Sequence, residues 1–244
     1  MRRSERPVKQ LPVSLMVGFL ICLALQFTLG RSESGLHRFE YQELERPFSF
    51  QVYRTLSLGS TGLAGALFSL QLQLHDNQFG EHFSYKKLDY SNLIDRLNVS
   101  KSLSEYADYP MLLATRVYTN TTDIENLRLL VAWVEKTFDE DPQRHWRHLT
   151  EAVLIAKHKI NDLDLALRLA LKLFAQPTKI KMPHWARDMK LLILADLNQY
   201  ESAIAIIEAL LASNSIDDND EKRFLREKLS LFQQKVFESR QIDD

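Results

Sequence analysis

The feature that most constrains this chain is a stretch of 17 residues, 13–29, that carries no charge. Four basic residues precede it, namely Arg2, Arg3, Arg6 and Lys9. As an α-helix the stretch would rise about 25 Å, which nearly matches the hydrocarbon core of a bilayer. We therefore expect residues 13–30 to form a single transmembrane helix, with residues 1–12 as its basic cytoplasmic flank.

Two interpretations of this segment compete, because a basic segment followed by an apolar one is also typical of a cleavable signal peptide. Residues 26–31 contain no clean small-x-small cleavage site, which favours the uncleaved anchor. The positive-inside rule then predicts that the bulk of the chain lies outside the cytoplasm, and in a bacterial inner membrane it would face the periplasm. Cleavage would instead release a secreted protein.

The composition of the whole chain predicts an all-α fold. Only 7 Gly and 7 Pro occur in 244 residues, which is sparse for turn-rich β architecture and suits long helices joined by short loops. The single cysteine, Cys22, lies inside the apolar stretch. The rest of the chain therefore has no thiol for a disulfide, a zinc–thiolate site or a cysteine nucleophile.

Residues 31–58 follow the apolar stretch, and we expect them to form a polar tether that ends in an extended strap. The strap is predicted by apolar residues that fall mostly on alternate positions, the period of an extended chain: Phe48, Phe50, Val52, Leu56 and Leu58. Residues 59–244 are then expected to form one helical domain.

Residues 56–74 carry no charge, so a second membrane pass has to be considered. Gln71 and Gln73 lower the hydrophobicity of this stretch and argue against a membrane pass. Leucines at helical spacing instead predict a helix that buries a leucine stripe against other helices. The stripe consists of Leu63, Leu67, Leu70 and Leu74.

A weak internal repeat organises the C-terminal half, because similar segments start at residues 123, 162 and 199, at intervals of 39 and 37 residues. Each segment lies between two apolar patterns, which predicts helix pairs at 109–119 with 123–138, 146–159 with 162–175 and 184–196 with 200–213, and a last helix at 219–238. The second helices are expected to bury Leu127, Val131 and Val134, then Ala166, Ala170 and Leu173, then Ala203, Ile207 and Leu210.

The helix pairs, the small residues Ala166 and Ala203 and the aromatic Tyr118 resemble the tetratricopeptide-repeat (TPR) family over about residues 107–215. The resemblance implies a TPR-like α-solenoid of about three helical hairpins plus a C-terminal helix, with a concave groove that holds a partner peptide or helix. The first helix of each hairpin lines this groove in the family. By that register the groove positions are Tyr109, Arg116, His148, Glu151, His158, Lys159, Trp185 and Asp188.

Signatures of catalysis are missing from the sequence. No GxGxxG, GxxxxGK[ST], GxSxG or HExxH pattern occurs, so we expect no catalytic residue, no metal and no cofactor. His145, His148 and His158 could in principle contribute metal ligands, but a basic helix face explains them more simply. The alternative that stays open is an enzyme with an unrecognised site at a helix interface.

Charge is unevenly distributed along the chain. Residues 144–190 hold ten Lys/Arg against four Asp/Glu, whereas 32–143 hold ten against 16 and 191–244 hold six against 11. Pairing between stacked repeats would explain the basic block, and so would a surface for an acidic partner or for anionic lipid. The acidic balance of the part after the apolar stretch argues against nucleic-acid binding. The resulting hypothesis is a membrane-anchored adaptor or assembly factor for a membrane-associated complex.

Overall fold

The computed structural model describes residues 13–32, 43–57, 59–75, 85–104, 108–177, 179–213, 216 and 218–243. Within these residues all regular structure is helical and no strand occurs, so the all-α fold class is confirmed. The predicted basic flank, 1–12, and most of the predicted tether lie outside the described residues. The chain divides into two units, residues 1–42 with 78–81 and residues 43–77 with 82–244.

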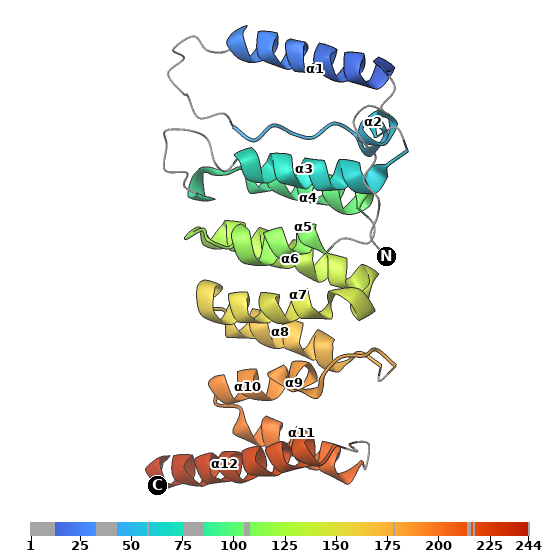
Figure 1. Cartoon of the computed structure of the whole chain (residues 1–244). Helices are drawn as coiled ribbons and strands as arrows, with labels where there is room; N and C mark the ends of the chain where they lie inside the picture. Colours follow the sequence, from blue (N-terminus) through green and yellow to red (C-terminus); the bar gives the residue numbers. More distant parts are fainter. Residues whose placement is uncertain are drawn as a thin grey trace. The chain divides into compact units, whose positions relative to one another are not determined.

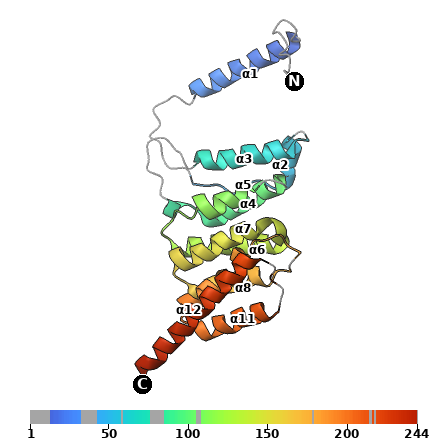
Figure 2. The ribbon, with the colours of Figure 1, turned by 60° about the horizontal axis from the view of Figure 1, so that its bottom comes forward.

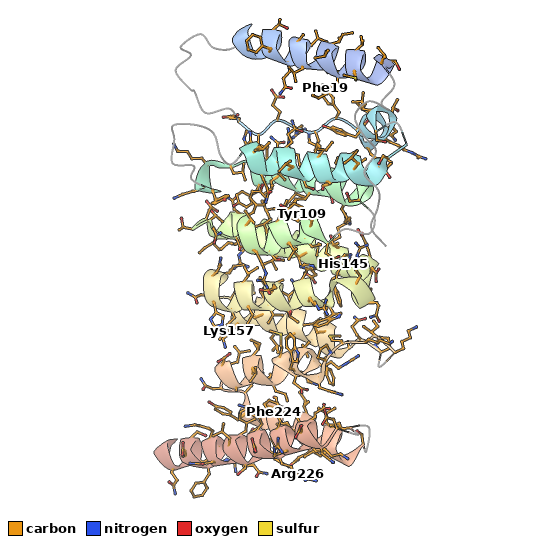
Figure 3. The ribbon with its side chains drawn as sticks, viewed as in Figure 1. Phe19, Tyr109, His145, Lys157, Phe224 and Arg226 are labelled. Carbon is orange, nitrogen blue, oxygen red and sulfur yellow. The ribbon has the colours of Figure 1, made fainter. Side chains whose placement is uncertain are left out.

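The N-terminal unit contributes one described helix, α1 (Val13–Ser32), which covers the charge-free stretch. The large apolar side chains that the structure describes on α1 are exposed, among them Phe19 (Figure 3). Across the described part of the chain, no helix combines the length and the apolar content needed to cross a membrane. Membrane anchoring therefore stays a prediction from the sequence.

The predicted extended strap is wrong, because Phe50–Leu56 forms a short helix, α2. The half-buried side chains are Phe50, Tyr53 and Ser57, which follow helical spacing, whereas Phe48 and Val52 are exposed. Tyr53 packs edge-on against Phe68 of the next helix, with ring centroids 4.8 Å apart. This aromatic contact stabilises the helical conformation. The alternation of apolar residues covers too few positions to predict an extended chain reliably.

Helix α3 (Thr61–His75) packs against α4 (Tyr90–Leu103), and the short helix η2 (Tyr85–Lys87) precedes α4. The buried side of α3 consists of Gly65, Phe68, Ser69 and Leu72. The predicted burial of the leucine stripe is therefore wrong: Leu63, Leu67, Leu70 and Leu74 are 61, 57, 48 and 62% exposed.

Close backbone approach explains why α3 turns its small residues inward. The hydroxyls of Ser69 and Ser100 lie 2.5 Å apart across the α3–α4 contact. A Cβ added to Gly65 would lie 1.8 Å from Ser104 Oγ and 3.0 Å from Ser104 Cβ. Leucines on the buried side of α3 would hold the two helices further apart, and the hydrogen bond between the Ser69 and Ser100 hydroxyls would be lost.

Substitution of Gly65 by alanine should therefore lower the free energy of unfolding by about 1 kcal/mol, since Ser104 Oγ can turn away but its Cβ cannot. Gly62 is the matched control on the same helix, because a Cβ there meets nothing within 4 Å. Gly62→Ala should raise stability by up to about 1 kcal/mol through reduced backbone entropy. Thermal unfolding of both variants checks the prediction, and equal melting temperatures would contradict it.

The remaining helices follow in the predicted pairs (Figure 1). The first pair is α5 (Tyr109–Leu112), which continues as η3 (Leu113–Val117), and α6 (Ile124–Glu140). The second is α7 (Pro142–Ile155), continued as η4 (Ala156–Ile160), and α8 (Leu163–Phe174). The third is α9 (His184–Arg187) and α10 (Met189–Asp196) with α11 (Tyr200–Ala212). A last helix, α12 (Asn219–Asp243), packs along α11 and extends beyond it (Figure 2).

The repeated segments begin the second helix of each pair, which explains their recurrence. Asp123 caps α6 by accepting from the amide of Asn126 at 3.1 Å, and Asp162 caps α8 by accepting from that of Leu165 at 2.8 Å. A short polar side chain at this position satisfies an amide that has no partner within the helix. In the third pair Gln199 takes the position without a side-chain cap.

The buried stripes predicted for the second helices are confirmed, with Leu210 only half-buried and the other eight buried. Each helix packs on its neighbours in the chain: α6 on α7, α7 on α8, α8 on α10, α10 on α11 and α11 on α12. The buried side chains form two clusters, one running from Leu44 to Ile193 and a smaller one that includes Ala203, Ile207 and Phe232.

Candidate binding site

Four of the eight predicted groove residues line one hollow of about 370 Å³ between successive helix pairs. We call it the η3–η4 hollow. Its lining residues come from η3 and the loop after it on one side, and from α7 and η4 on the other: Thr115, Arg116, Thr119, Glu151, Leu154, Ile155, His158 and Lys159. The register thus predicted correctly that Arg116 lies close to three residues that follow it by 35 to 43 positions.

Both first helices that border the hollow end in a π-helical turn. η3 (Leu113–Val117) and η4 (Ala156–Ile160) occupy equivalent places in successive pairs, 43 residues apart. π-helical turns are rare, and they occur frequently at functional sites because they break the regular hydrogen-bond ladder. The first helix of the third pair has no such turn, because both of its parts, α9 and α10, are α-helical. The two π-helical turns therefore mark the hollow between the first and second pairs.

Neighbouring units donate hydrogen bonds to two carbonyl groups directly after the turn η3. The Tyr90 hydroxyl, from the preceding pair, donates to the Tyr118 carbonyl at 2.7 Å. The Lys159 ammonium, from the following pair, donates to the Thr119 carbonyl at 2.7 Å. Because buried carbonyls without partners are costly, these donors stabilise the segment after η3 between its two neighbours.

The charge in the η3–η4 hollow is predominantly positive. Arg116 Nη2 lies 2.6 Å from Glu151 Oε1, and the side chains of this pair are 66 and 34% exposed. An ion pair so exposed contributes little to stability, so Arg116 can exchange this carboxylate for another. Lys159 uses one ammonium hydrogen on the Thr119 carbonyl and has two others, and His158 is exposed beside it.

The other four predicted groove residues lie elsewhere. Tyr109, at the start of α5 (Figure 3), lines a second hollow of about 750 Å³ together with Phe50, Leu70 and Leu103. His148 is buried, and this burial lowers its pKa to about 4. Its ring lies 6.3 Å from that of His145, also buried. A neutral, buried imidazole offers no groove contact.

Trp185 and Asp188 belong to the α9–α10 region. Trp185 is 58% exposed and stands edge-on against Trp146 of the preceding pair, with ring centroids 5.9 Å apart. Asp188 is buried, and burial raises the pKa of its carboxyl to about 6, against the opposing effect of His184, Lys190 and Arg187. The two residues neither contact the η3–η4 hollow nor line a described one.

Most basic residues of the block 144–190 form contacts with other parts of the protein. Arg144 pairs with Asp108 at 2.9 Å, Lys157 with Asp196 at 2.5 Å, and both Arg168 and Lys172 with Glu135. The Arg187 guanidinium donates to three backbone carbonyls, those of Gln176, Pro177 and Ile180. This favours the simpler of the two explanations for the basic block, which is pairing between stacked units.

These ion pairs have a regular spacing along the chain. Among the described residues, every ion pair between different helices or their caps joins residues 33 to 39 positions apart. That separation is one repeat length, close to the 37 and 39 residues between the repeated segments. A charged side chain of one unit therefore regularly meets a residue near the equivalent position of the next.

Four further residues that line the hollow were not predicted from the sequence, namely Thr115, Thr119, Leu154 and Ile155. The Thr115 and Thr119 hydroxyls donate to the carbonyls four residues earlier, of Met111 and Thr115, at 2.9 and 3.1 Å. Threonines spaced by four in a first helix are the one signal that could have drawn attention to this irregular segment. No signal in the sequence identifies the π-helical turns themselves.

No group of three or more His, Cys, Asp or Glu side chains suited to a metal ion occurs among the described residues. Comparison of the chain with family models, with curated proteins and with solved structures finds no match.

Proposed function

We propose that this chain is a membrane-attached helical-repeat binding module that serves as an adaptor or assembly factor, and that its η3–η4 hollow holds an acidic segment of a protein partner. The observation that carries the proposal is the convergence of Arg116, Glu151, His158 and Lys159 on one hollow bordered by two π-helical turns. Residues from two units line it, so a ligand there would also bridge the units.

An acidic partner fits the charges of the hollow. Two cations and one imidazole face a single carboxylate, that of Glu151, which already neutralises part of Arg116. A partner carboxylate could replace or join Glu151, with Leu154 and Ile155 beside it for an apolar side chain. Arginine is favoured for this task because its guanidinium binds carboxylates through two parallel hydrogen bonds.

The repeat of ion pairs at 33–39 residues supports a solenoid of stacked hairpins, which is the architecture that the resemblance to the TPR family implies. The α3–α4 hairpin adds one unit before those predicted, because Lys101 of α4 pairs with Glu140 of α6 at 2.6 Å in the same register. Such arrays expose long surfaces whose commonest use is to bind a peptide or a helix.

The hollow is tested by capturing partners on the purified full-length protein and eluting them by salt. Arg116→Ala and Lys159→Ala should each weaken capture, by roughly threefold to tenfold if each removes one charged contact. Lys179→Ala is the matched control, because it removes a charge from the same basic block at an exposed position outside the hollow.

Folding has to be monitored in the same variants. Arg116 is 66% exposed, so its replacement should change the free energy of unfolding by no more than about 0.5 kcal/mol. If Arg116→Ala unfolded the domain, or if both hollow variants kept every partner at wild-type strength, the hollow would not be the binding site.

Membrane attachment through residues 13–30 rests on the basic flank and the charge-free stretch of the sequence. Resistance to carbonate extraction, together with an intact N-terminus in the membrane fraction, is the expected result. A mature N-terminus after residue 30 in a soluble fraction would favour the secreted alternative, with the same hollow and no anchor.

A further inference from the structure

The outward side of α3 is a continuous apolar surface. Its four leucines are 48–62% exposed, and the other exposed residues of the helix are Gly62, Ala66 and Gln71. We call this surface the α3 leucine face and define it by Leu63, Leu67, Leu70 and Leu74. A single exposed leucine needs no explanation, but four on one stripe of one helix do.

The opposite end of the array shows what a solvent-facing terminal helix looks like in this protein. Helix α12 presents charged side chains between its exposed apolar ones, among them Arg223, Arg226, Glu227 and Lys235. Terminal units of helical arrays need such polar outer faces to remain soluble. Helix α3 belongs to the first hairpin, and no charged residue occurs between Leu56 and Leu74.

The neighbouring helix α2 adds two features. Val52 and Leu56 are large apolar side chains that are 41 and 71% exposed. Arg54, also on α2, is exposed and its guanidinium forms no ion pair among the described residues. Arg54 lines the second hollow together with Leu70 of the leucine face. An unpaired arginine beside an exposed leucine is the arrangement with which amphipathic segments meet a phospholipid surface.

We propose that the α3 leucine face lies in the interfacial region of a lipid bilayer, with Arg54 at the level of the phosphate groups. The proposal rests on the membrane attachment proposed above. Residues 33–42 connect Ser32 to Glu43, where the second unit begins, and span at most roughly 40 Å, so an anchor at residues 13–30 would keep the start of that unit within reach of the membrane surface.

The lack of acidic and basic residues on α3 itself favours lipid over protein as the occupant. Protein interfaces surround an apolar centre with a polar rim, which fixes the orientation of the partner. On α3 itself the exposed residues beside the leucines are Gly62, Ala66 and Gln71, and Arg54 is the one charged residue among the described residues that line the adjoining second hollow. A bilayer needs no fixed orientation, and contact with acyl chains requires the absence of charge that α3 shows.

Fluorescent probes on single cysteines test the proposal in the full-length protein, reconstituted into vesicles of equal parts phosphatidylcholine and phosphatidylglycerol. Cys22, the chain's own cysteine, reports insertion of the anchor. In a Cys22→Ser background, Leu67→Cys reports the α3 leucine face and Arg226→Cys reports a solvent-facing site on α12. Leu63→Cys and Leu70→Cys provide two further exposed positions should Leu67→Cys fail to fold.

We expect doxyl-labelled lipid to quench the probe at residue 67 at least about twofold more than the probe at residue 226, and aqueous iodide to do the reverse. Quenching at residue 22 with an iodide-accessible residue 67 would overturn the inference and leave the anchor standing. Quenching at neither position would show that the membrane attachment itself is wrong. A probe at residue 67 that is shielded from both quenchers would place a protein surface, not lipid, on the α3 leucine face.

Discussion

Ala203→Leu is expected to lower the free energy of unfolding by roughly 1–3 kcal/mol, because it forces three extra carbons into a closed helix contact. Ala203 has no exposed surface and sits in the smaller core cluster, where α10, α11 and α12 meet. Ala166→Leu should act in the same way, since Ala166 is equally buried on α8. Denaturant unfolding, followed by circular dichroism, measures both effects.

A matched control lies two residues further along the same helix. Ala205 is exposed on α11, so Ala205→Leu adds the same atoms without overpacking and should change stability by no more than about 0.5 kcal/mol. If Ala203→Leu and Ala205→Leu behaved alike, helix propensity would explain the result and the tight contact at Ala203 would be refuted. Neither buried alanine lines the η3–η4 hollow, so loss of binding in these variants should follow loss of folding.

The sequence predicted the helical pairs well because both of their signals are local. Asp123 and Asp162 mark the N-termini of α6 and α8, and stripes such as Leu127, Val131 and Val134 mark the faces that are buried. Each signal depends only on residues within one helix. The order of the helices then follows from their order in the chain, since neighbours in sequence stack on one another.

The errors concern side chains whose placement depends on a partner helix. The leucine stripe of α3 has the ideal spacing for burial, yet Gly65 and Ser69 are buried instead because they allow contact with Ser100 and Ser104. Hydrophobic periodicity ranks faces by apolarity and contains no information about how closely two backbones can approach. The same limit applies to His148, because its polar side chain and its polar neighbours in the sequence predict an exposed position, whereas the structure buries it.

The η3–η4 hollow shows the corresponding limit for the site. Register alone placed Arg116, Glu151, His158 and Lys159 on facing first helices, and the structure brings them together. The segment directly after η3 receives hydrogen bonds from both adjoining units, donated by Tyr90 to the Tyr118 carbonyl and by Lys159 to the Thr119 carbonyl. These donors lie 28 and 40 positions from their acceptors, so no local pattern could identify the contacts.

Lys190→Met is expected to stabilise the fold by about 1–2 kcal/mol at pH 7, against the usual direction of core substitutions. The Lys190 side chain has no exposed surface, and its ammonium lies over the Phe174 ring without a hydrogen-bond partner among the described residues. Burial lowers the pKa of this lysine to about 8, with Asp188 opposing the shift. Methionine fills a similar volume and carries no charge to desolvate.

The pH dependence separates this explanation from simple packing. A lysine pKa lowered from 10.5 to about 8 means that the neutral amine favours the fold above pH 10.5, and that this contribution is lost as pH falls through 8. Below pH 8 the wild type carries the buried charge, so the advantage of Lys190→Met should be full at pH 7 and should shrink between pH 8 and 10.5. Asp188, whose pKa is raised to about 6, loses its own contribution as pH rises from about 4 through 6 in the wild type. Lys190 opposes this rise, so the pKa of Asp188 should be higher in Lys190→Met, and only the trend between pH 8 and 10.5 reports on the lysine.

Thermal unfolding of the wild type and Lys190→Met from pH 6 to 10 tests the prediction, with Lys181→Met as the control at an exposed position. The control should show no pH-dependent difference from the wild type, because an exposed ammonium keeps its hydration. A loss of stability in Lys190→Met at pH 7 would mean that the attraction between the ammonium and the Phe174 ring exceeds the cost of burying the charge. In that case the lysine would be a structural part of the α8–α10 contact, and its removal should also loosen the packing of α10 on α8.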